Sequence, residues 1–419
     1  MKIKRIVARE IIDSRGNPTI EADLFLESGT MGRAAVPSGA STGIHEALEL
    51  RDNDAQKWGG QGVEKAISNV NTKISDIILG KENLSQLEFD KLLLDLDGTS
   101  DKSNIGANAI LAASLAYAWA VSRERKLPLY KYIGEIYGNS NYAMPRPLLN
   151  IMNGGKHANW ATDIQEYMLI PVKAESWADK LRIGVEIYHN LEKIIKAKGL
   201  STNVGNEGGF APLLSSNQEA LDIIVEAIAK SNYKLGEDIM IGFDAAASEF
   251  YNSTTQKYEL KRDGVSYNSA EMLGWIKKLV AAYPVLSLED MFSEDDWEGW
   301  HNLTMTFGDT KQIVGDDLLV TNTKRIERAI AEKACNALLV KVNQIGSLTE
   351  ALNAMKMASN AGWNNILSHR SGETEDITIA HIAVGTGCGQ IKTGAPARGE
   401  RTAKYNELTR IAEEVEKKL

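Results

Sequence analysis

Three carboxylates in the second half of the sequence each come directly after a short run of apolar residues: Asp244, Glu289 and Asp316. Carboxylates that met in one cleft would repel one another, so their convergence would imply a bound cation. Oxygen ligands without cysteine favour Mg²⁺ or Mn²⁺ over Zn²⁺. The alternative is that each carboxylate only caps the helix after it, which accounts well for any one residue but poorly for three together.

Basic residues end further apolar runs in the same way: Lys341, Arg370 and Lys392. Such side chains bind carboxylate or phosphate groups, and a lysine with a neutral fraction can also accept a proton. We expect them on the side of the cleft opposite the carboxylates. A lysine at a strand end can instead simply reach solvent, but the recurrence of the pattern favours one active site. A metal, a lysine and an anion-binding group together indicate removal of a proton next to a substrate carboxylate.

The spacing of these residues indicates the elements that position them. Glu289, Asp316, Lys341, His369 and Lys392 lie 27, 25, 28 and 23 residues apart. One strand with its helix takes about 30 residues, and short apolar runs are typical of parallel strands that are buried on both faces. In a (β/α)8 barrel the carboxyl ends of the strands open on one face, where active sites lie. The sequence therefore predicts an α/β fold with a catalytic TIM-like barrel.

The first part of the chain has a different pattern. Strands that form an antiparallel meander, followed by helices, are predicted at 3–12, 18–27, 31–36, 62–79, 85–95 and 107–121. The segment Gly138-Asn139-Ser140-Asn141 has the composition of a linker. We therefore predict a smaller α+β domain over residues 1–137 and the barrel over 138–419. Residues 38–43 are small, and we expect them to form a mobile flap over a ligand, although an ordinary loop is the alternative.

Composition limits the classes of function. A chain of 419 residues exceeds one ordinary core, and its net charge of −9 argues against direct binding of nucleic acid. Cys335 and Cys388 lack the spacing of a metal site, which indicates a reducing cytoplasm. The N-terminal residues show no secretory signal, and no run of 18 apolar residues is present that could span a membrane.

Longer motifs around these residues resemble the enolase family from end to end. They are Asp13-Ser14-Arg15-Gly16-Asn17-Pro18, Val36-Pro37-Ser38-Gly39-Ala40-Ser41-Thr42-Gly43, Val340-Lys341-Val342-Asn343-Gln344-Ile345-Gly346, Ser368-His369-Arg370-Ser371-Gly372-Glu373-Thr374 and Lys392-Thr393-Gly394-Ala395-Pro396. The resemblance implies Mg²⁺-dependent, reversible dehydration of 2-phospho-D-glycerate to phosphoenolpyruvate in glycolysis and gluconeogenesis. It also implies a barrel whose first units are irregular, and a homodimer or larger homo-oligomer.

The resemblance also implies a role for each matched residue. Two Mg²⁺ ions would bind per active site, the first at Asp244, Glu289 and Asp316 and the second with Ser41 and the substrate phosphate. Lys341 would be the base at C2, and Glu207, supported by Glu166, would be the acid for the leaving hydroxyl. The substrate would be held by His157, Glu166, Arg370, Ser371 and Lys392, with His369 close by. Segments 38–43, 152–162 and 251–266 would close over it to exclude water.

To act as a base, Lys341 must be neutral in a useful fraction of the molecules. An ordinary lysine, with a pKa of ~10.4, is almost wholly charged at neutral pH. The enolase superfamily is known to use a Lys or His base with one or two Mg²⁺ ions. These ions, Lys392 and partial burial would disfavour the charged form of Lys341 and lower its pKa.

Three positions depart from the family pattern: Asn206, where relatives usually carry Asp, Lys156, where the residue is generally small, and Met291, where Pro or Gly is common. None is a matched ligand or the base, but the first two could alter the rate or its pH dependence.

Two other functions compete with this interpretation. A superfamily relative acting on another carboxylate would lack Ser41, His157, Arg370 and Ser371, which are all present. A structural or surface-binding protein that kept the fold, with a minor pool at the cell surface, would have lost the catalytic residues, and they are retained. Surface capture is often linked to a terminal lysine, whereas this sequence ends with Leu419.

Overall fold

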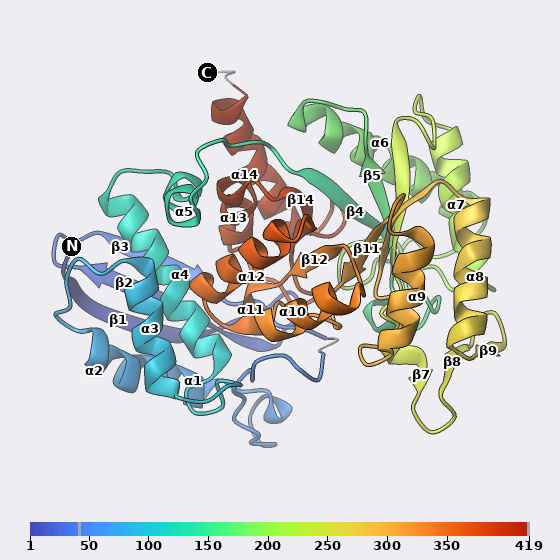
Figure 1. Cartoon of the computed structure of the whole chain (residues 1–419). Helices are drawn as coiled ribbons and strands as arrows, with labels where there is room; N and C mark the ends of the chain where they lie inside the picture. The colour runs from blue at the N-terminus through green and yellow to red at the C-terminus, as the bar shows by residue number, and fades with distance from the viewer. Residues whose placement is uncertain (41–42, 417–419) are drawn as a thin grey trace.

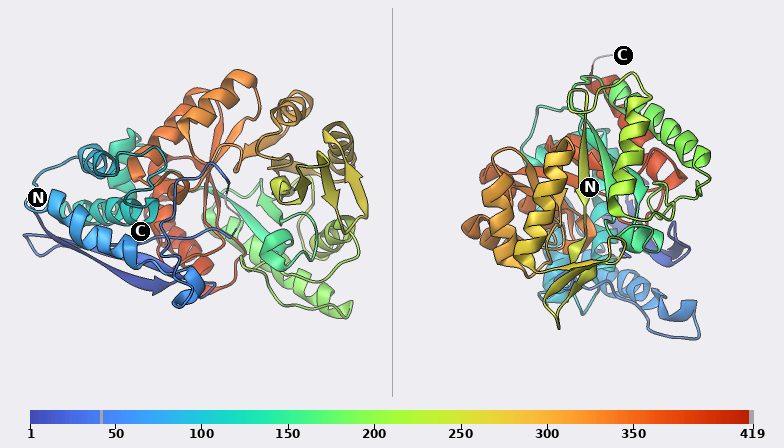
Figure 2. Two further views of the ribbon diagram at one scale, coloured as in Figure 1. Left: turned by 90° about the horizontal axis from the view of Figure 1, so that it is seen from below. Right: turned by 90° about the vertical axis from the view of Figure 1, so that its right-hand side faces the viewer.

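The computed structural model describes residues 1–40 and 43–416 of the chain. Elements from the N-terminal part lie to one side of a barrel that is formed by the rest of the chain (Figures 1 and 2). The fold is α/β, with a smaller α+β part followed by a TIM-like barrel, as predicted. The predicted boundary between residues 137 and 138 falls where helix α5 ends, at Tyr137, and the division into these two domains stays a prediction.

The N-terminal part begins with an antiparallel meander of β1 (Ile3–Ile12), β2 (Pro18–Leu26) and β3 (Met31–Ala35). It continues with the helical segments η1 (Trp58–Gly60), α1 (Glu64–Asn69), η2 (Val70–Ile74), α2 (Ser75–Ile78), α3 (Gln86–Asp97), α4 (Ala107–Glu124) and α5 (Leu129–Tyr137). Helix α4 is buried on nearly all sides, as its composition predicts. It approaches β3 closely, because a Cβ atom on Gly32 would lie 2.1 Å from the carbonyl oxygen of Ala116.

Among the described residues, eight strands close into a barrel. They are β4 (Arg146–Asn153), β5 (Glu166–Pro171), β6 (Ile239–Asp244), β10 (Val285–Glu289), β11 (Gln312–Gly315), β12 (Ala337–Val340), β13 (Asn364–Ser368) and β14 (Gly389–Lys392). Strand β5 runs antiparallel to both β4 and β6, while the other neighbours are parallel. The irregular first units of the barrel are thereby confirmed.

Helices surround the barrel and short elements lie at its mouth. The helices are α6 (Trp177–Ala197), α7 (Asn217–Ala229), α8 (Ser269–Ala282), α9 (Trp297–Phe307), α10 (Thr323–Glu332), α12 (Leu348–Asn360), α13 (Thr378–Thr386) and α14 (Gly399–Val415). The short elements are η3 (Gly155–Ala158), η4 (Ala247–Phe250), β7 (Tyr251–Asn252), β8 (Lys257–Leu260), β9 (Val265–Tyr267) and α11 (Val342–Ile345). Helices α6 and α7 both lie between β5 and β6 in the chain, so the reversed strand is followed by two helices. Within the described residues, no helix is long and apolar enough to cross a membrane.

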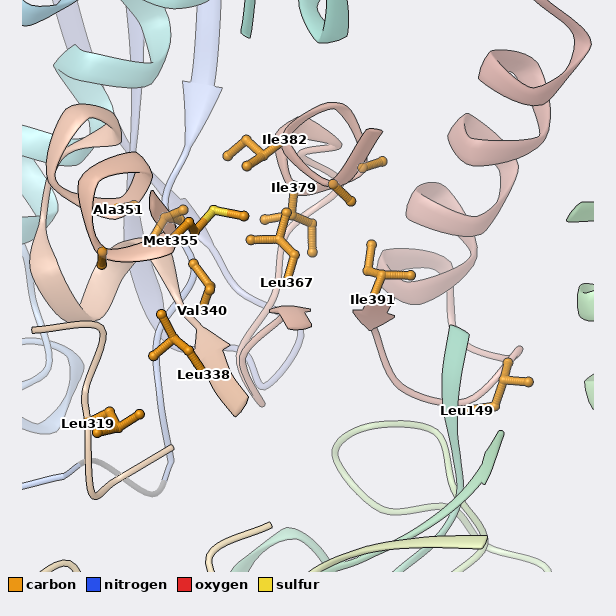
Figure 3. Packing of buried hydrophobic residues seen from close by; sticks show 14 of the residues in the cluster. Leu149, Leu319, Leu338, Val340, Ala351, Met355, Leu367, Ile379, Ile382 and Ile391 are labelled. Carbon is orange, nitrogen blue, oxygen red and sulfur yellow. The ribbon is translucent and has the colours of Figure 1, made fainter. Parts of the chain in front are cut away.

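Strand β12 shows why an uninterrupted apolar run is needed in this barrel. Successive side chains of a strand point to opposite faces, and all four residues of β12 are fully buried. Both faces of the strand are therefore covered. Leu338 and Val340 pack with side chains of α12 and α13, including Met355 and Ile379 (Figure 3). Leu339 belongs instead to a separate apolar cluster formed mainly by residues of the barrel strands. Burial on both faces therefore leaves only the strand end for a functional polar residue.

The N-terminal part is fastened to the mouth of the barrel. Ser38 and Gly372 exchange two backbone hydrogen bonds of 2.8 and 2.9 Å. The ammonium of Lys102 lies 2.9 Å from a carboxylate oxygen of Glu350 on α12. These contacts place the segment that leads into the expected flap next to the loop that follows β13.

Candidate active site

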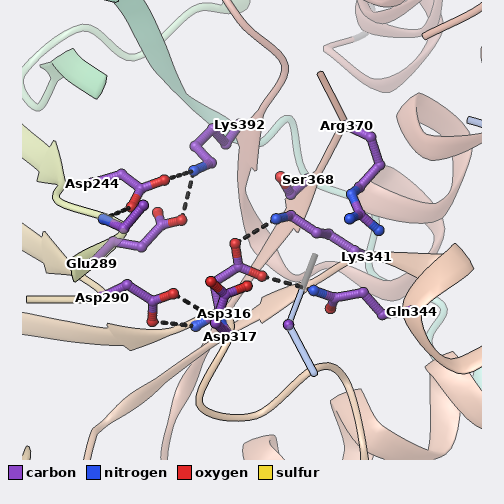
Figure 4. A network of polar contacts seen from close by, with 12 residues as sticks. Asp244, Glu289, Asp290, Asp316, Asp317, Lys341, Gln344, Ser368, Arg370 and Lys392 are labelled. Atoms are coloured by element: carbon purple, nitrogen blue, oxygen red, sulfur yellow. Dashed lines mark hydrogen bonds and ion pairs between the residues drawn. The ribbon is translucent and has the colours of Figure 1, made fainter. Parts of the chain in front are cut away.

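Asp244, Glu289 and Asp316 meet at the mouth of the barrel. Asp244 and Glu289 are register partners on β6 and β10, and Asp316 directly follows the neighbouring strand β11. All three are buried, and each offers a carboxylate oxygen within 4.8 Å of those of the other two (Figure 4). The strand ends thus bring together the three carboxylates that the sequence singled out.

Lys392 was expected across the cleft from these carboxylates, but it lies among them. Its Nζ atom is 2.6 Å from Glu289 Oε1, 3.2 Å from Glu166 Oε2 and 3.3 Å from Asp244 Oδ2 (Figure 4). Burial lowers the pKa of Lys392, but the attraction of the carboxylates outweighs it and raises the pKa. The expectation was wrong because the sequence indicates only where a strand ends. The long side chain of Lys392 reaches from the end of its own strand to carboxylates on other strands.

Lys341 forms an ion pair with Asp316. Gln344 Nε2 donates a 2.9 Å hydrogen bond to the other oxygen of Asp316, and the backbone amide of Lys341 donates to Thr321 Oγ1 at 3.0 Å. Burial lowers the pKa of Lys341, but the attraction of Asp316 outweighs it, so the net direction is upward. This differs from the lowered pKa expected from the sequence, because that expectation counted neighbouring cations and did not foresee the carboxylate partner.

The carboxylate cluster has the chemistry of a divalent-cation site. Its donors are oxygen atoms, which suits Mg²⁺. Glu289 Oε2 is buried and has no hydrogen-bond partner among residues 1–40 and 43–416. Burial and the proximity of Asp244 raise the pKa of Glu289, so a bound cation would stabilise its charged form. These residues therefore fit the metal that the resemblance implies.

Asp290 supports the carboxylate cluster through hydrogen bonds with backbone amides. It accepts hydrogen bonds from the backbone amides of Asp316 and Asp317, at 2.9 and 2.8 Å. Its backbone has a φ of 44°, a left-handed conformation that is uncommon outside glycine. Asp290 and Asp317 were not predicted from the sequence, although each directly follows a predicted ligand. The adjacent acidic pairs in the sequence, Glu289-Asp290 and Asp316-Asp317, were the signal that could have identified them.

Glu166, Glu207 and His157 form a second group. Because β5 is reversed, its first residue, Glu166, lies at the mouth and pairs with Asn153 and Asp244 in the strand register. His157 Nδ1 is 3.5 Å from Glu207 Oε1 and 3.9 Å from Glu166 Oε1. Burial, followed by repulsion from Glu207, raises the pKa of Glu166. Neighbouring carboxyl groups such as those of Glu166 and Glu207 share one proton more readily than they both become charged.

Glu207 comes from the loop between α6 and α7 and is held from several sides. Asn150 Nδ2 donates to Glu207 Oε2 at 2.9 Å, and His369 Nε2 lies 3.3 Å from the same oxygen. Burial, with a smaller contribution from Arg401, lowers the pKa of His369 to about 4. His369 is therefore neutral near pH 7. Asn150 and Arg401 carried no signal in the sequence, because neither lies in a recognisable pattern.

Arg370 and Ser371 face the N-terminal part of the chain. Arg370 donates 3.0 Å hydrogen bonds to Glu46 and one of 2.8 Å to Asn343. Ser371 Oγ accepts a 2.7 Å hydrogen bond from the amide of Ala40. Ser41, predicted to bind the second metal ion, lies outside the described residues.

One cavity lies between the two groups, and of the three metal-site carboxylates Asp316 lines it. It is lined mainly by polar side chains, among them His157, Glu166, Glu207, Asp316, Lys341, His369, Arg370, Ser371 and Lys392. In the closed strand order, β12 and β5 are four places apart, so Lys341 and Glu166 approach this cavity from opposite sides of the barrel. A lysine thus faces a carboxyl pair across a site that can hold a cation.

Comparison with protein families covers nearly the whole chain. The model described as "Enolase, N-terminal domain" matches residues 3–133, and the model described as "Enolase, C-terminal TIM barrel domain" matches residues 141–419. The chain belongs to the enolase family. Membership confirms the predicted resemblance and supports a lyase reaction of the enolase type.

The three departures from the family pattern have different surroundings. Lys156 lies on η3 beside His157, and its Nζ atom is 2.6 Å from Glu249 Oε2 on η4. Asn206 donates its backbone amide to the carbonyl of His157 at 3.0 Å. Met291 is fully buried in the large apolar core, so its side chain serves packing. Lys156 and Asn206 therefore remain the departures that are able to affect the reaction.

Proposed function

We propose that this enolase-family chain catalyses the reversible dehydration of 2-phospho-D-glycerate to phosphoenolpyruvate. The observation that carries the proposal is that Lys341 faces the Glu166–Glu207 pair across a cavity that is also lined by Asp316 of the carboxylate triad. The anion-binding side chains His157, Arg370, Ser371 and Lys392 line the same cavity, which supports a substrate with both phosphate and carboxylate groups. As further parts of the proposal, the enzyme acts in glycolysis and gluconeogenesis, in the cytoplasm, as a homodimer or larger homo-oligomer.

Asp244, Glu289 and Asp316 would hold one Mg²⁺ ion, and Ser41 would help to hold a second. The bound ions would supply positive charge that stabilises the substrate carboxylate as C2 loses its proton. Because the site is buried, such charge acts with little screening by water.

Lys341 is the proposed base. It removes the proton from C2 and keeps it on Nζ, so it must first be neutral. Its ion pair with Asp316 opposes this, and the base therefore needs Asp316 to have another cationic partner. Burial and the nearby Arg370 and Lys392 then lower the pKa of Lys341, in the direction that a base requires.

Glu207 is the proposed acid. It donates a proton to the hydroxyl on C3, which leaves as water while the C2–C3 double bond forms. Burial raises the pKa of Glu207, but His157, His369 and Arg401 outweigh it, so the net direction is downward. The acid role therefore requires neutral histidines: burial lowers the pKa of both rings, and without their positive charge Glu207 is better able to hold its proton.

The proposal is tested by following the absorbance of phosphoenolpyruvate after 2-phospho-D-glycerate is added. Activity should disappear in excess chelator and return with Mg²⁺. Asp316→Asn and Glu289→Gln should weaken Mg²⁺ binding measured by calorimetry. Asp238→Asn is the matched control, because Asp238 pairs with Lys173 outside the cavity. Undiminished turnover in excess chelator, or no turnover at any Mg²⁺ concentration, would contradict the proposal.

A further inference from the structure

Arg401 is a buried cation that the proposed mechanism does not use. It lies in the first turn of α14 and is completely shielded from solvent. An arginine is almost never fully buried unless it is paired, and here both terminal nitrogens donate hydrogen bonds, whereas Nε has only a 3.5 Å contact with Glu400 Oε1. Its surroundings therefore show what it holds in place.

The Arg401 guanidinium joins two loops of the candidate active site. One arm, NH2, donates to the carbonyl oxygens of Asn206 at 2.9 Å and Ser371 at 2.8 Å. The other arm, NH1, donates to the carbonyl oxygen of Arg370 at 2.6 Å. One rigid, planar group thus sets the distance between the loop of the proposed acid and the loop that follows β13.

The same guanidinium fixes the tautomer of His369. NH1 lies 2.7 Å from His369 Nδ1. Because a guanidinium has donors and no acceptor, Nδ1 must be the acceptor in this pair. The proton of the neutral ring is then on Nε2, which lies 3.3 Å from Glu207 Oε2. A charged ring would direct a second N–H at the guanidinium, so Arg401 also opposes protonation of His369.

Glu207 Oε2 therefore accepts one hydrogen bond and lies near the N–H of His369, whose Nε2 has no hydrogen-bond partner of its own among the described residues. Asn150 Nδ2 donates to Glu207 Oε2 at 2.9 Å, and the amide must have this orientation because its carbonyl oxygen would repel the carboxylate. Because Oε2 accepts from Asn150 and faces the N–H of His369, the acidic proton of Glu207 is favoured on Oε1. That oxygen is the one that faces His157, at 3.5 Å.

We propose that Arg401 is a positioning residue that fixes His369 as the Nε2–H tautomer and thereby directs the acidic proton of Glu207 to Oε1. His369 then presents a neutral N–H to the acid, 3.3 Å from Glu207 Oε2, and is not a cation that binds the substrate. The consequence for catalysis rests on the proposed function of Glu207, whereas the link between Arg401 and His369 does not.

Nitrogen-15 NMR of imidazole-labelled protein tests the link directly. The sequence has six histidines, and a His369→Gln variant identifies the His369 signals. The wild type should show a protonated Nε2 and a hydrogen-bonded, unprotonated Nδ1, with ring protonation only near pH 4. A protonated Nδ1 in the neutral wild-type ring would overturn the proposal without any Arg401 variant.

The Arg401→Met variant tests the cause. Its Nδ1 signal should move to the position of an unbonded nitrogen, and His369 should protonate at higher pH, because the repulsion from the guanidinium is lost while Glu373, and Glu207 when it is ionised, favour the charged ring. Arg401→Lys should restore part of the Nδ1 shift through its one ammonium. Arg398→Met is the matched control, since Arg398 is nearby on the chain and shares the Glu400 contact with Arg401, but its other hydrogen bond goes to Ser14 and it has no contact with His369 among those of the described residues.

Kinetic measurements distinguish a positioning role of Arg401 from a purely structural role. Arg401→Met should lower kcat by about 10- to 100-fold, as for other outer partners of functional histidines, with a smaller change in KM. Arg401→Lys should recover part of the loss, and Arg398→Met should be close to wild type. A folded Arg401→Met protein with an unshifted Nδ1 signal and unchanged kcat would overturn the proposal. A wild type without dehydratase activity would overturn the proposed function only, because the NMR result would still decide the link.

Discussion

Asn206 is the departure from the family pattern that lies closest to the proposed acid. Its backbone is fixed on both sides, by the carbonyl of His157 and by the guanidinium of Arg401, so a change of side chain alters charge more than geometry. Relatives usually carry Asp here, and a negative charge next to Glu207 favours the protonated acid. The neutral amide of Asn206 removes that effect.

Asn206→Asp should therefore raise the pKa of Glu207. The limb of the pH–rate profile that reports this acid should move toward alkaline pH, by at most about one unit, the usual spread of pKa values in folded proteins. The measurement is kcat/KM against pH for the variant and the wild type. An unchanged profile, or a shift toward acid, would show that hydrogen bonding or solvent screening outweighs the charge.

At the level of elements, the pattern of strand ends predicted part of the site and missed the rest for topological reasons. Asp244, Glu289, Asp316 and Lys341 follow parallel strands, so an apolar run that ends in a charge was enough to find them. Glu166 begins a reversed strand, and Glu207 lies in a loop. These two could be proposed only from the resemblance to the family.

The segment 251–266, which was expected to be a flap, contains most of a small antiparallel sheet, β7 to β9, and its closure over the substrate stays a prediction. Arg262, in the turn between β8 and β9, donates two hydrogen bonds of 2.8 and 2.6 Å to the carbonyl oxygen of Trp160. Lys156 reaches Glu249 of η4 from the same loop. The loop that carries His157 is therefore attached at two points to the neighbouring segment.

Lys156→Met should loosen the attachment of His157. Because the ion pair is partly exposed, its contribution is about 0.2–1 kcal/mol, and KM should rise by about two- to fivefold with kcat largely kept. The charge-swapped double variant Lys156→Glu/Glu249→Lys should recover part of the loss. Lys173→Met removes a comparable surface pair outside the cavity and should leave KM unchanged. Equal effects of the two lysine variants would contradict a local role for Lys156.

Leu338 tests the packing that holds β12, and thus Lys341, in place. It is fully buried against the surrounding helices (Figure 3). Leu338→Ala should lower the free energy of unfolding, measured by urea denaturation, by about 2–5 kcal/mol. Leu213→Ala should cost less than about 0.5 kcal/mol, because Leu213 is 66% exposed. Similar losses at both positions would contradict the assigned packing.

At the scale of the whole molecule, the active site depends on contact between the N-terminal part and the barrel. The backbone of Ser38 pairs with that of Gly372, and Glu46 binds Arg370 from the same side. This contact joins residues more than 300 positions apart, so no local pattern could predict it. The sequence did predict the two types of architecture that meet there.

Gly372→Ala should disturb this contact. Its Cβ atom would lie 2.3 Å from Asp13 Oδ2 and 2.6 Å from Ser38 Oγ, so the N-terminal segment must shift. Because small misplacements in an active site are costly, kcat/KM should fall on the order of 10²-fold, while circular dichroism stays close to that of the wild type. Gly399→Ala meets no atom within 4 Å and serves as the control. Wild-type kcat/KM in Gly372→Ala would show that this contact does not position the site.

The assignment of Lys341 as base and Glu207 as acid is the central claim, and exchange of the C2 proton of 2-phospho-D-glycerate with deuterated solvent tests it most directly. Lys341→Ala should lose both exchange and dehydration, by at least about 10²–10⁴-fold, while calorimetry still detects Mg²⁺ binding. Glu207→Gln should lose dehydration but keep at least part of the exchange, because the base remains. Exchange at a near wild-type rate in Lys341→Ala would show that another residue removes the proton and would contradict the assignment.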